Sequence, residues 1–266
     1  MSNRKQSLCT DRQTDRQTDR QTAWTLLALL IGFVTIGLVA SSCATRTKST
    51  LPTYNLIASP VGQRCLTRPS QAEVDSLVAI YGRNKDLLPE YSDVLVVALS
   101  YYPELQSTHI KFEYSSEQTT MASRPASVFP PRRYKIVINN DPQFKGIPFD
   151  SIPYNAAVGI VGHELAHIVE YETKTLLGLL DCLLLYSDKS HGKAYFEKTT
   201  DLTTIQHGLG WQLYDWAKYA MYDNQIASEE YKAFKQRTYL SPDEIEQYIR
   251  HYAKYATPYL RAIQAE

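Results

Sequence analysis

Two histidines and a glutamate stand close together in the stretch IVGHELAHIVEY, residues 160 to 171. His163 and His167 are four residues apart, so on a helix they lie on one face and can aim ring nitrogens at a single metal ion. Glu164 would lie beside that face, where a carboxylate can take the proton of an activated water. The spacing therefore predicts two ligands of a zinc site and a general base, and a third ligand must come from elsewhere in the chain.

The alternative is a buried helix whose histidines are satisfied by ordinary hydrogen bonds. With this content of His and Glu, the pattern would arise by chance in roughly one sequence of a hundred. The surrounding residues, 154 to 171, are apolar on nearly all sides, which predicts a helix through the middle of a domain. Such a helix has few reasons to carry two histidines and a glutamate, so the context favours the metal site.

A second acidic pair follows the histidine motif. Glu197 and Asp201 lie four residues apart on a predicted helix, and Glu197 comes 30 residues after His167. Taken alone, such a pair is more often a solvated acidic edge of a helix. Glu170 and Thr173 stand where the metzincin pattern requires a glycine and a third histidine, which excludes that class of zinc peptidase.

The motif His-Glu-x-x-His followed by Glu-x-x-x-Asp resembles the gluzincins, the zinc peptidase superfamily of thermolysin and neprilysin. The resemblance covers only residues 160 to 201. It implies a zinc-dependent metallopeptidase with one Zn2+ ion, in which Glu197 is the third ligand. It also implies that Asp201 accepts a hydrogen bond from the non-ligating nitrogen of a zinc histidine, with His163 as the favoured partner. The substrate would be a peptide or protein, and Glu164 would take a proton from the attacking water and pass it to the leaving amine.

Other residues compete for roles at this site. His207 is interpreted as a candidate group for stabilising the transition state rather than as a ligand. Tyr186, Tyr195 and His207 all remain candidates for the donor to the oxyanion. Four further side chains near the motif are weaker candidates for the third ligand: Glu170, Glu172, Asp181 and His191.

The elements that must position these residues predict an α+β fold with a small sheet followed by a mostly helical C-terminal part. The resemblance to the gluzincins implies that this fold is a zincin-like domain. Strands are predicted at 108 to 115 and 132 to 140 from alternating and β-branched residues. The segment YKIVINN, 134 to 140, is interpreted by its position as the edge that aligns a substrate, with a central core strand as the alternative. Apolar periodicity predicts helices at 71–82, 90–102, 154–171, 175–187, 191–206, 209–222, 227–237 and 242–256.

The first 42 residues are interpreted as a leader and signal segment. Residues 11 to 22 repeat the tetrapeptide DRQT three times, and an uncharged apolar run follows from Ala23 to Ala40. The run and the small residues before Cys43 resemble a bacterial lipoprotein signal, although Ala40 stands where leucine is usual. The resemblance implies a lipid anchor on Cys43 that holds the protein in the bacterial cell envelope. A single-pass signal anchor or an ordinary cleaved signal are the alternatives.

Residues 43 to 70 are rich in Ser, Thr and Pro and predict a tether, so the catalytic domain is expected at 71 to 266. Cys65 and Cys182 are candidates for one disulfide, although the sequence does not show that they meet. The apolar stretch 175 to 186 is interpreted as core, with a lid or membrane-facing surface as the alternative. Equal numbers of basic and acidic residues, 28 of each, do not indicate a nucleic-acid-binding surface.

Two non-enzymatic functions compete with the peptidase. One is a non-catalytic zinc-binding envelope lipoprotein that acts as a scaffold or binding module. The other is a structural lipoprotein in which the motif is fortuitous. Glu164 favours the enzyme, because a scaffold has no need of a carboxylate at that position.

Overall fold

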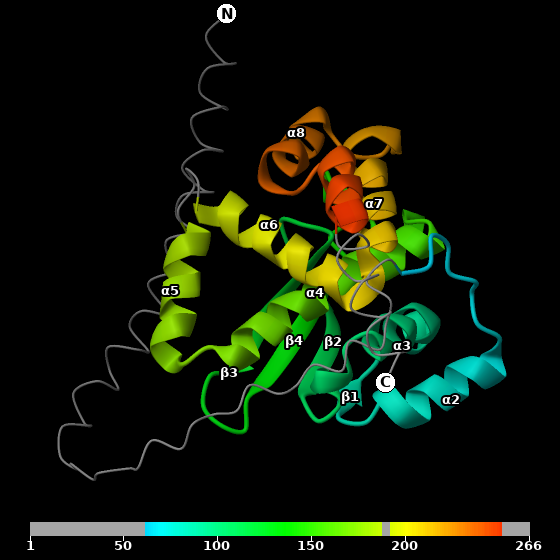
Figure 1. Ribbon diagram of the computed structural model, residues 1–266, viewed down its shortest axis with the longest axis vertical. Helices are drawn as coiled ribbons and strands as arrows, with labels where there is room; N and C mark the ends of the chain where they lie inside the picture. The colour runs from blue at the N-terminus through cyan, green and yellow to red at the C-terminus, as the bar shows by residue number, and fades with distance from the viewer. Residues whose placement is uncertain (1–61, 188–191, 252–266) are drawn as a thin grey trace, which may run out of the picture. The chain divides into compact units, whose positions relative to one another are not determined.

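The computed structural model describes residues 62 to 187 and 192 to 251 (Figure 1). These residues belong to one compact unit, Asn55–Glu266. The predicted leader, the apolar run and Cys43 lie outside the described residues. Within the described ranges, no helix has both the length and the apolar composition needed to cross a membrane.

A small mixed sheet forms one layer of the domain. Its strands follow the order β1-β2-β4-β3, in which β1, β2 and β4 are parallel and β3 runs antiparallel to β4. The strand bounds are β1 Lys85–Asp86, β2 His109–Ser115, β3 Met121–Ser127 and β4 Arg133–Asn139. The predicted strands at 108 to 115 and 132 to 140 are therefore confirmed, and the fold is α+β.

The position of β4 corrects one interpretation of the sequence. Residues 134 to 139 of this segment belong to β4, which is paired on both sides, so the segment is a central strand and not an edge. The edge strands are β1 and β3, and the sequence of β3, MASRPAS, lacks the β-branched pattern of a strand and contains Pro125. A proline is tolerated there because an edge strand has one side without ladder partners.

Two helices precede most of the sheet, α2 (Gln71–Tyr81) and α3 (Ser92–Ser100), both as predicted. Short 3-10 turns flank α3, η1 (Pro89–Tyr91) and η2 (Pro103–Leu105), because each begins with a proline that suits a first turn. Helix α3 is the more deeply buried: Leu95, Val96 and Ala98 are completely inaccessible to solvent. It packs against α2 and against the long helix that carries the histidines.

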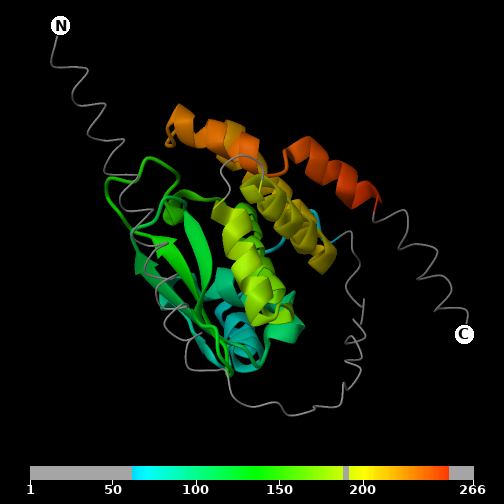
Figure 2. The same ribbon diagram turned by 90° about the vertical axis from the view of Figure 1, so that its left-hand side faces the viewer.

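The long helix α4 (Tyr154–Thr173) runs through the centre of the domain after a 3-10 turn, η3 (Phe149–Ser151). Residues 156 to 169 of α4 are all buried, because the helix contacts β3 on one side and α7 on another. Figure 2 shows it between the sheet and the C-terminal helices. The helices approach most closely at Gly159, where an added Cβ would lie 2.2 Å from the carbonyl oxygen of Gln212. Gly159 thus permits the contact of α4 with α7.

The C-terminal part is helical, as predicted. Its elements are α5 (Leu176–Ser187), α6 (Gly192–Thr204), the π-helical segment η4 (Ile205–Leu209), α7 (Gly210–Lys218), the π-helical segment η5 (Tyr219–Asp223) and α8 (Glu229–Thr238). The chain continues as a helix from 242 to 251. Its capping box is present, because the backbone N–H of Ser241 donates to Glu244 Oε2 at 2.7 Å and that of Glu244 donates to Ser241 Oγ at 3.3 Å.

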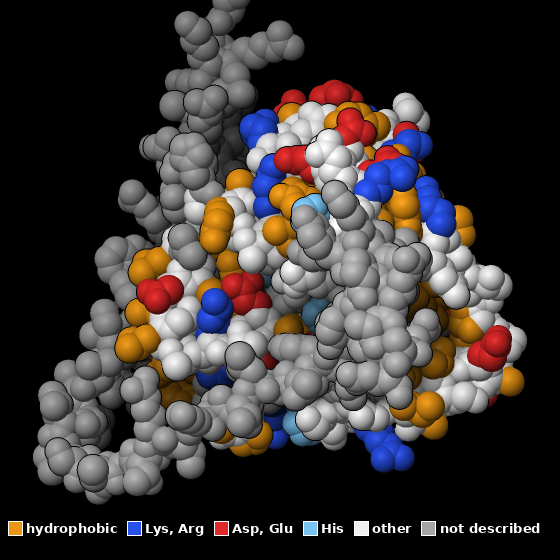
Figure 3. Space-filling model, viewed as in Figure 1, with side chains coloured by type: hydrophobic (Ala, Val, Ile, Leu, Met, Phe, Trp, Pro, Cys, Tyr) orange, Lys and Arg blue, Asp and Glu red, His pale blue; other side chains and the backbone are white. Residues whose placement is uncertain are grey.

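Helix α5 lies at the surface, which corrects its interpretation as core. Leu177 is 73 % exposed and Leu184 is 62 % exposed, while Cys182 on the inner side is buried. Hydrophobic side chains accordingly gather over α5, at the left of Figure 3. Cys65 is an exposed free thiol and Cys182 a buried one, so the two cysteines do not form the disulfide that was considered.

The residues before α2 already contact the helical part. The side chain of Gln212 donates to the backbone oxygen of Gln63 at 2.9 Å, and the backbone N–H of Leu66 donates to Asn155 Oδ1 at 3.0 Å. Arg64 forms an ion pair with Asp215 at 2.9 Å. Residues 63 to 66 are thus joined to the starts of α4 and α7.

Candidate metal centre

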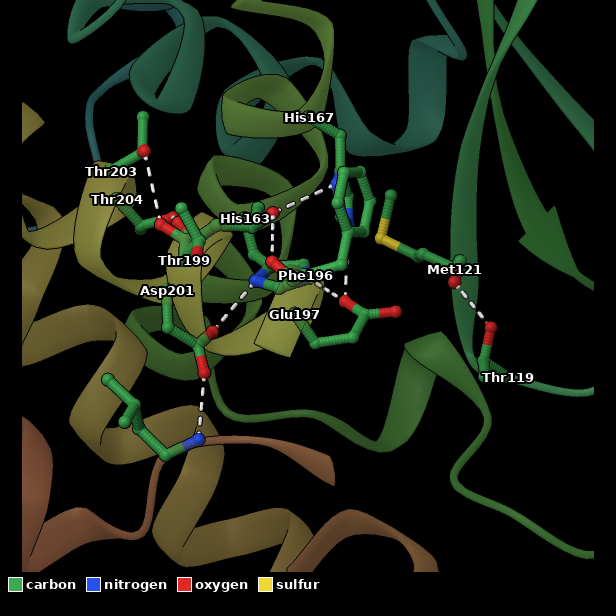
Figure 4. A network of polar contacts seen from close by, with 12 residues as sticks. Thr119, Met121, His163, His167, Phe196, Glu197, Thr199, Asp201, Thr203 and Thr204 are labelled. Carbon is green, nitrogen blue, oxygen red and sulfur yellow. Dashed lines mark hydrogen bonds and ion pairs between the residues drawn. The ribbon is translucent and has the colours of Figure 1, made fainter. Parts of the chain in front are cut away.

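His163, His167 and Glu197 converge between two helices. Both histidines come from α4 and Glu197 from α6, and one potential ligand atom from each lies within 4.8 Å of the other two (Figure 4). Glu197 Oε2 is 3.1 Å from His163 Nε2 and 3.2 Å from His167 Nε2. All three residues are at most 5 % exposed. The structure therefore contains a buried group of two nitrogens and one carboxylate that could hold a metal ion, and the name metal-binding cluster denotes these three residues below.

Nδ1 of each histidine, the ring nitrogen that does not contact Glu197, has its own hydrogen-bond partner. Asp201 Oδ1 lies 2.8 Å from His163 Nδ1. Thr200 Oγ1 lies 3.1 Å from His167 Nδ1 and donates its own proton to the backbone oxygen of Phe196. The hydroxyl oxygen can then accept only from an Nδ1–H group, which leaves the Nε2 lone pair of His167 for a metal.

Asp201 thus has the partner that the resemblance implied, whereas Thr200 was missed. Thr200 follows Phe196 by one helical turn and immediately precedes Asp201. Threonine is common at such positions in helices, so the sequence alone does not identify Thr200 as a partner of His167.

Charge interactions hold the three side chains together. Burial opposes the charged form of His163, but its contacts with Asp201 and Glu197 outweigh burial and raise its pKa to about 10. Burial would likewise raise the pKa of Glu197, but the two histidines hold it well below the ordinary value. A carboxylate flanked by imidazoles is the charge distribution that favours binding of a divalent cation once the ring proton is displaced.

Glu164 lies in the same buried region with an unused oxygen. The residue is 5 % exposed, and its Oε2 atom is buried without a hydrogen-bond partner among the described residues. Leaving a buried carboxylate oxygen without a donor is costly. This oxygen is therefore available to a water molecule or a reacting group beside the metal-binding cluster.

Aromatic side chains enclose the cluster. Phe196 stacks on His167 with ring centroids 5.1 Å apart, and Tyr239 meets His163 edge-on at 5.5 Å. Tyr186 packs edge-on against Phe196 at 6.2 Å. Burial, and then the nearby carboxylates led by Glu197, raise the pKa of both tyrosines, so both phenols are neutral, although Tyr186 is still 41 % exposed.

Tyr239 was not considered from the sequence. It follows α8, 42 positions beyond Glu197, and no local spacing relates the two residues. Tyr186, by contrast, was one of three candidates for an oxyanion donor, and the structure brings it to this wall.

The remaining candidates lie elsewhere. The ring of His207 stacks on Tyr102 with centroids 4.3 Å apart, and its Nε2 lies 2.6 Å from Glu104 Oε1, so its contacts are with these residues rather than with the cluster. Tyr195 is 69 % exposed, Asp181 is exposed and Glu170 pairs with Lys174 at 3.5 Å. His191 lies outside the described residues.

The donor set fits zinc, since two imidazoles with hydrogen-bonded Nδ1 atoms and one carboxylate are typical ligands of that ion. The chain matches no family model. It likewise matches no curated protein and no solved structure. The metal-binding cluster is accordingly defined by the geometry of its own residues.

Proposed function

We propose that this protein is a zinc-dependent metallopeptidase whose ligands are His163, His167 and Glu197. The observation that carries the proposal is the unpartnered Oε2 atom of Glu164 in a buried site beside three oriented ligand groups. A site with a purely structural metal has no need of a second buried carboxylate with a free oxygen. The order of these residues along the chain, with Asp201 one turn after Glu197, supports a relation to the gluzincins.

The chemistry follows from the residues. Zinc, when bound, would supply an activated water and polarise the carbonyl of the scissile peptide bond. Glu164 takes the proton of the attacking water on its free oxygen and delivers it to the leaving amine. The hydroxyl groups of Tyr239 and Tyr186 are the proposed donors to the developing oxyanion, and Tyr239 is preferred because its ring contacts His163.

The substrate is expected to bind along β3. This strand is an edge of the sheet and packs against α4, which carries two of the ligands. Arg124 of β3 lies near enough to Tyr186 for its charge to influence the pKa of that phenol. An extended peptide pairing with the free edge of β3 would therefore be led toward the metal-binding cluster.

The proposed location is the bacterial cell envelope, with the lipid anchor on Cys43 as the membrane attachment. It is supported by the apolar run Ala23 to Ala40 and the small residues that precede Cys43. Mass spectrometry of the amino-terminal peptide from the membrane fraction tests it. A diacylated peptide that begins at Cys43 is expected, and an unprocessed amino terminus would support a signal anchor instead.

The catalytic proposal is tested by comparing the wild-type protein with Glu164→Gln, both full length and in detergent. We expect equal zinc content and a loss of peptide-library cleavage of roughly 10²- to 10⁴-fold in the variant. Glu172→Gln is the matched control, because Glu172 is exposed on the same helix. Equal cleavage by wild type and Glu164→Gln would rule out the assigned role.

A non-catalytic zinc-binding scaffold is the second candidate function. The burial of all three ligand groups, at most 5 % exposed, favours it, because a substrate cannot reach them without movement of the enclosing side chains. Stoichiometric zinc without cleavage of any library peptide by the wild type would support this function over the peptidase. Failure to retain zinc would contradict both.

A further inference from the structure

A buried lysine lies behind the aromatic wall of the metal-binding cluster. Lys235 in α8 is 4 % exposed, and no carboxylate forms a salt bridge with it in the part of the chain that the structure describes. A charged side chain that is largely buried without a carboxylate partner needs some other stabilising contact. The mechanism described above makes no use of this charge.

Aromatic rings provide that contact. The ammonium nitrogen of Lys235 lies 4.1 Å from the ring centroid of Tyr239, which is the shortest of four such contacts. The other three rings are Trp216 at 5.5 Å, Tyr231 at 5.5 Å and Phe234 at 5.9 Å. All are within the distance at which the negative face of an aromatic ring attracts a cation. Lys235 is thus held in an aromatic cage of which Tyr239 is the nearest wall.

Tyr239 is shared between this cage and the metal-binding cluster. Its backbone N–H donates to the carbonyl of Lys235 at 3.0 Å, so it directly ends the last turn of α8. Its ring meets His163, and the next residue, Leu240, donates its N–H to Asp201 Oδ2 at 2.9 Å. The backbone is therefore fixed through Asp201, while the Tyr239 ring itself contacts His163, Phe234 and the ammonium group of Lys235.

The charge of Lys235 also suits its place. Lys235, Asp201 and Tyr239 all line one small cavity of about 10 Å³, close to the volume that a single water molecule needs. The site next to it contains three buried carboxylates, those of Glu164, Glu197 and Asp201. The positive charge of Lys235, which lines the same cavity as Asp201, has the sign that complements these carboxylates.

We propose that Lys235 is a positioning residue, whose ammonium group holds the ring of Tyr239 against His163 so that the tyrosine hydroxyl faces the metal-binding cluster. As far as turnover is concerned, the inference rests on the proposed peptidase function. The direction of the Tyr239 ring, however, can be measured without turnover. Removing the charge while keeping the volume should release the ring but leave the ligands in place.

Lys235→Met removes the charge and keeps an unbranched side chain, and Lys235→Arg retains the charge. We expect Lys235→Met to lower kcat by about three- to thirtyfold, the range of a cation–π contact, with KM changed by less than about twofold. Lys235→Arg should recover most of the loss. Lys232→Met is the matched control on the same helix, because Lys232 pairs with Glu229 and lies outside the cage.

The decisive comparison is made in a Tyr239→Phe background. If Lys235 acts through the hydroxyl of Tyr239, adding Lys235→Met to Tyr239→Phe should lower kcat by less than about twofold relative to Tyr239→Phe alone. An equal loss in both backgrounds would overturn the proposal. Lys235→Gln gives a second neutral variant if Lys235→Met does not fold.

A spectroscopic measurement separates this inference from the peptidase proposal. Fluorotyrosine introduced at position 239 should give one sharp fluorine resonance in the otherwise unchanged protein and in Lys235→Arg, with or without zinc. In Lys235→Met the resonance should broaden or shift, with zinc content unaltered. An unchanged resonance in Lys235→Met would contradict the positioning role even if no peptide is cleaved.

Discussion

Asp201 Oδ1 lies 2.8 Å from His163 Nδ1, whereas Nε2 of the same ring is the nitrogen proposed to bind the metal. The other oxygen of Asp201 accepts the backbone N–H of Leu240, so this carboxylate links the histidine of α4 to the end of α8. A hydrogen bond of this kind fixes the tautomer and the orientation of a ligand histidine.

Asp201→Asn should therefore weaken zinc binding by about 10- to 100-fold. An amide can turn its NH2 group toward Nδ1, which then accepts the hydrogen bond, so the ring proton lies on Nε2 and blocks metal binding there. Competition with a chromogenic chelator measures the affinity. Asp243→Asn, at an exposed position of the last described helix, is the control and should bind zinc as the wild type does. Unchanged affinity in Asp201→Asn would show that the contact does not orient the ligand.

The metal-free protein should become less stable as the pH rises. The folded protein raises the pKa of His163 from 6.5 to about 10, so it holds this proton more tightly than the unfolded chain does. The stabilisation is complete below pH 6.5 and is lost as the pH rises through about 10. Thermal unfolding of the chelator-treated protein across this window measures the loss. His163→Gln should remove the difference, and parallel curves for the two proteins would contradict the assignment.

Tyr239→Phe should lower kcat by roughly 10²- to 10³-fold, because it removes the hydroxyl preferred as donor to the oxyanion but keeps the ring against His163. Zinc content should stay the same. Tyr195→Phe is the control, since Tyr195 is 69 % exposed. If Tyr186→Phe has the larger effect on kcat, the donor is Tyr186 and the preference stated above is wrong.

Gly159→Ala should destabilise the protein by about 1 to 3 kcal/mol, because the new Cβ would lie 2.2 Å from the carbonyl oxygen of Gln212 and would push α7 away from α4. Chemical denaturation gives the free energy of unfolding. Gly178→Ala in α5 is the control: its Cβ would meet Lys174 Cβ at 3.3 Å, and the gain in helix propensity opposes this tight contact. Equal effects of the two changes would show that the α4 to α7 contact can yield without cost.

The exposed leucines of α5 should contribute little to folding. Leu177→Ser and Leu184→Ser are expected to change the free energy of unfolding by less than about 0.5 kcal/mol each. Leu165→Ala, which empties a fully buried position in α4, should cost about 2 to 5 kcal/mol. A cost above about 1 kcal/mol for either serine variant would mean that the α5 face is covered in the folded protein.

The sequence by itself determined the residues that share a helical face. The four-residue spacings of His163 with His167 and of Glu197 with Asp201 depend only on the period of the α-helix, and so do most helix positions and the capping box at Ser241. The strands at 108 to 115 and 132 to 140 followed from their side-chain patterns in the same way.

Only the tertiary structure decided which faces meet. Glu197 contacts both histidines, and Tyr239 and Lys235 lie beside them. His207 contacts Glu104 instead. The tertiary structure also put β3 at an edge of the sheet and left Leu177 and Leu184 of α5 exposed. These contacts join residues far apart in the chain and depend on how whole elements pack, whereas sequence periodicity carries information only about neighbours within one element.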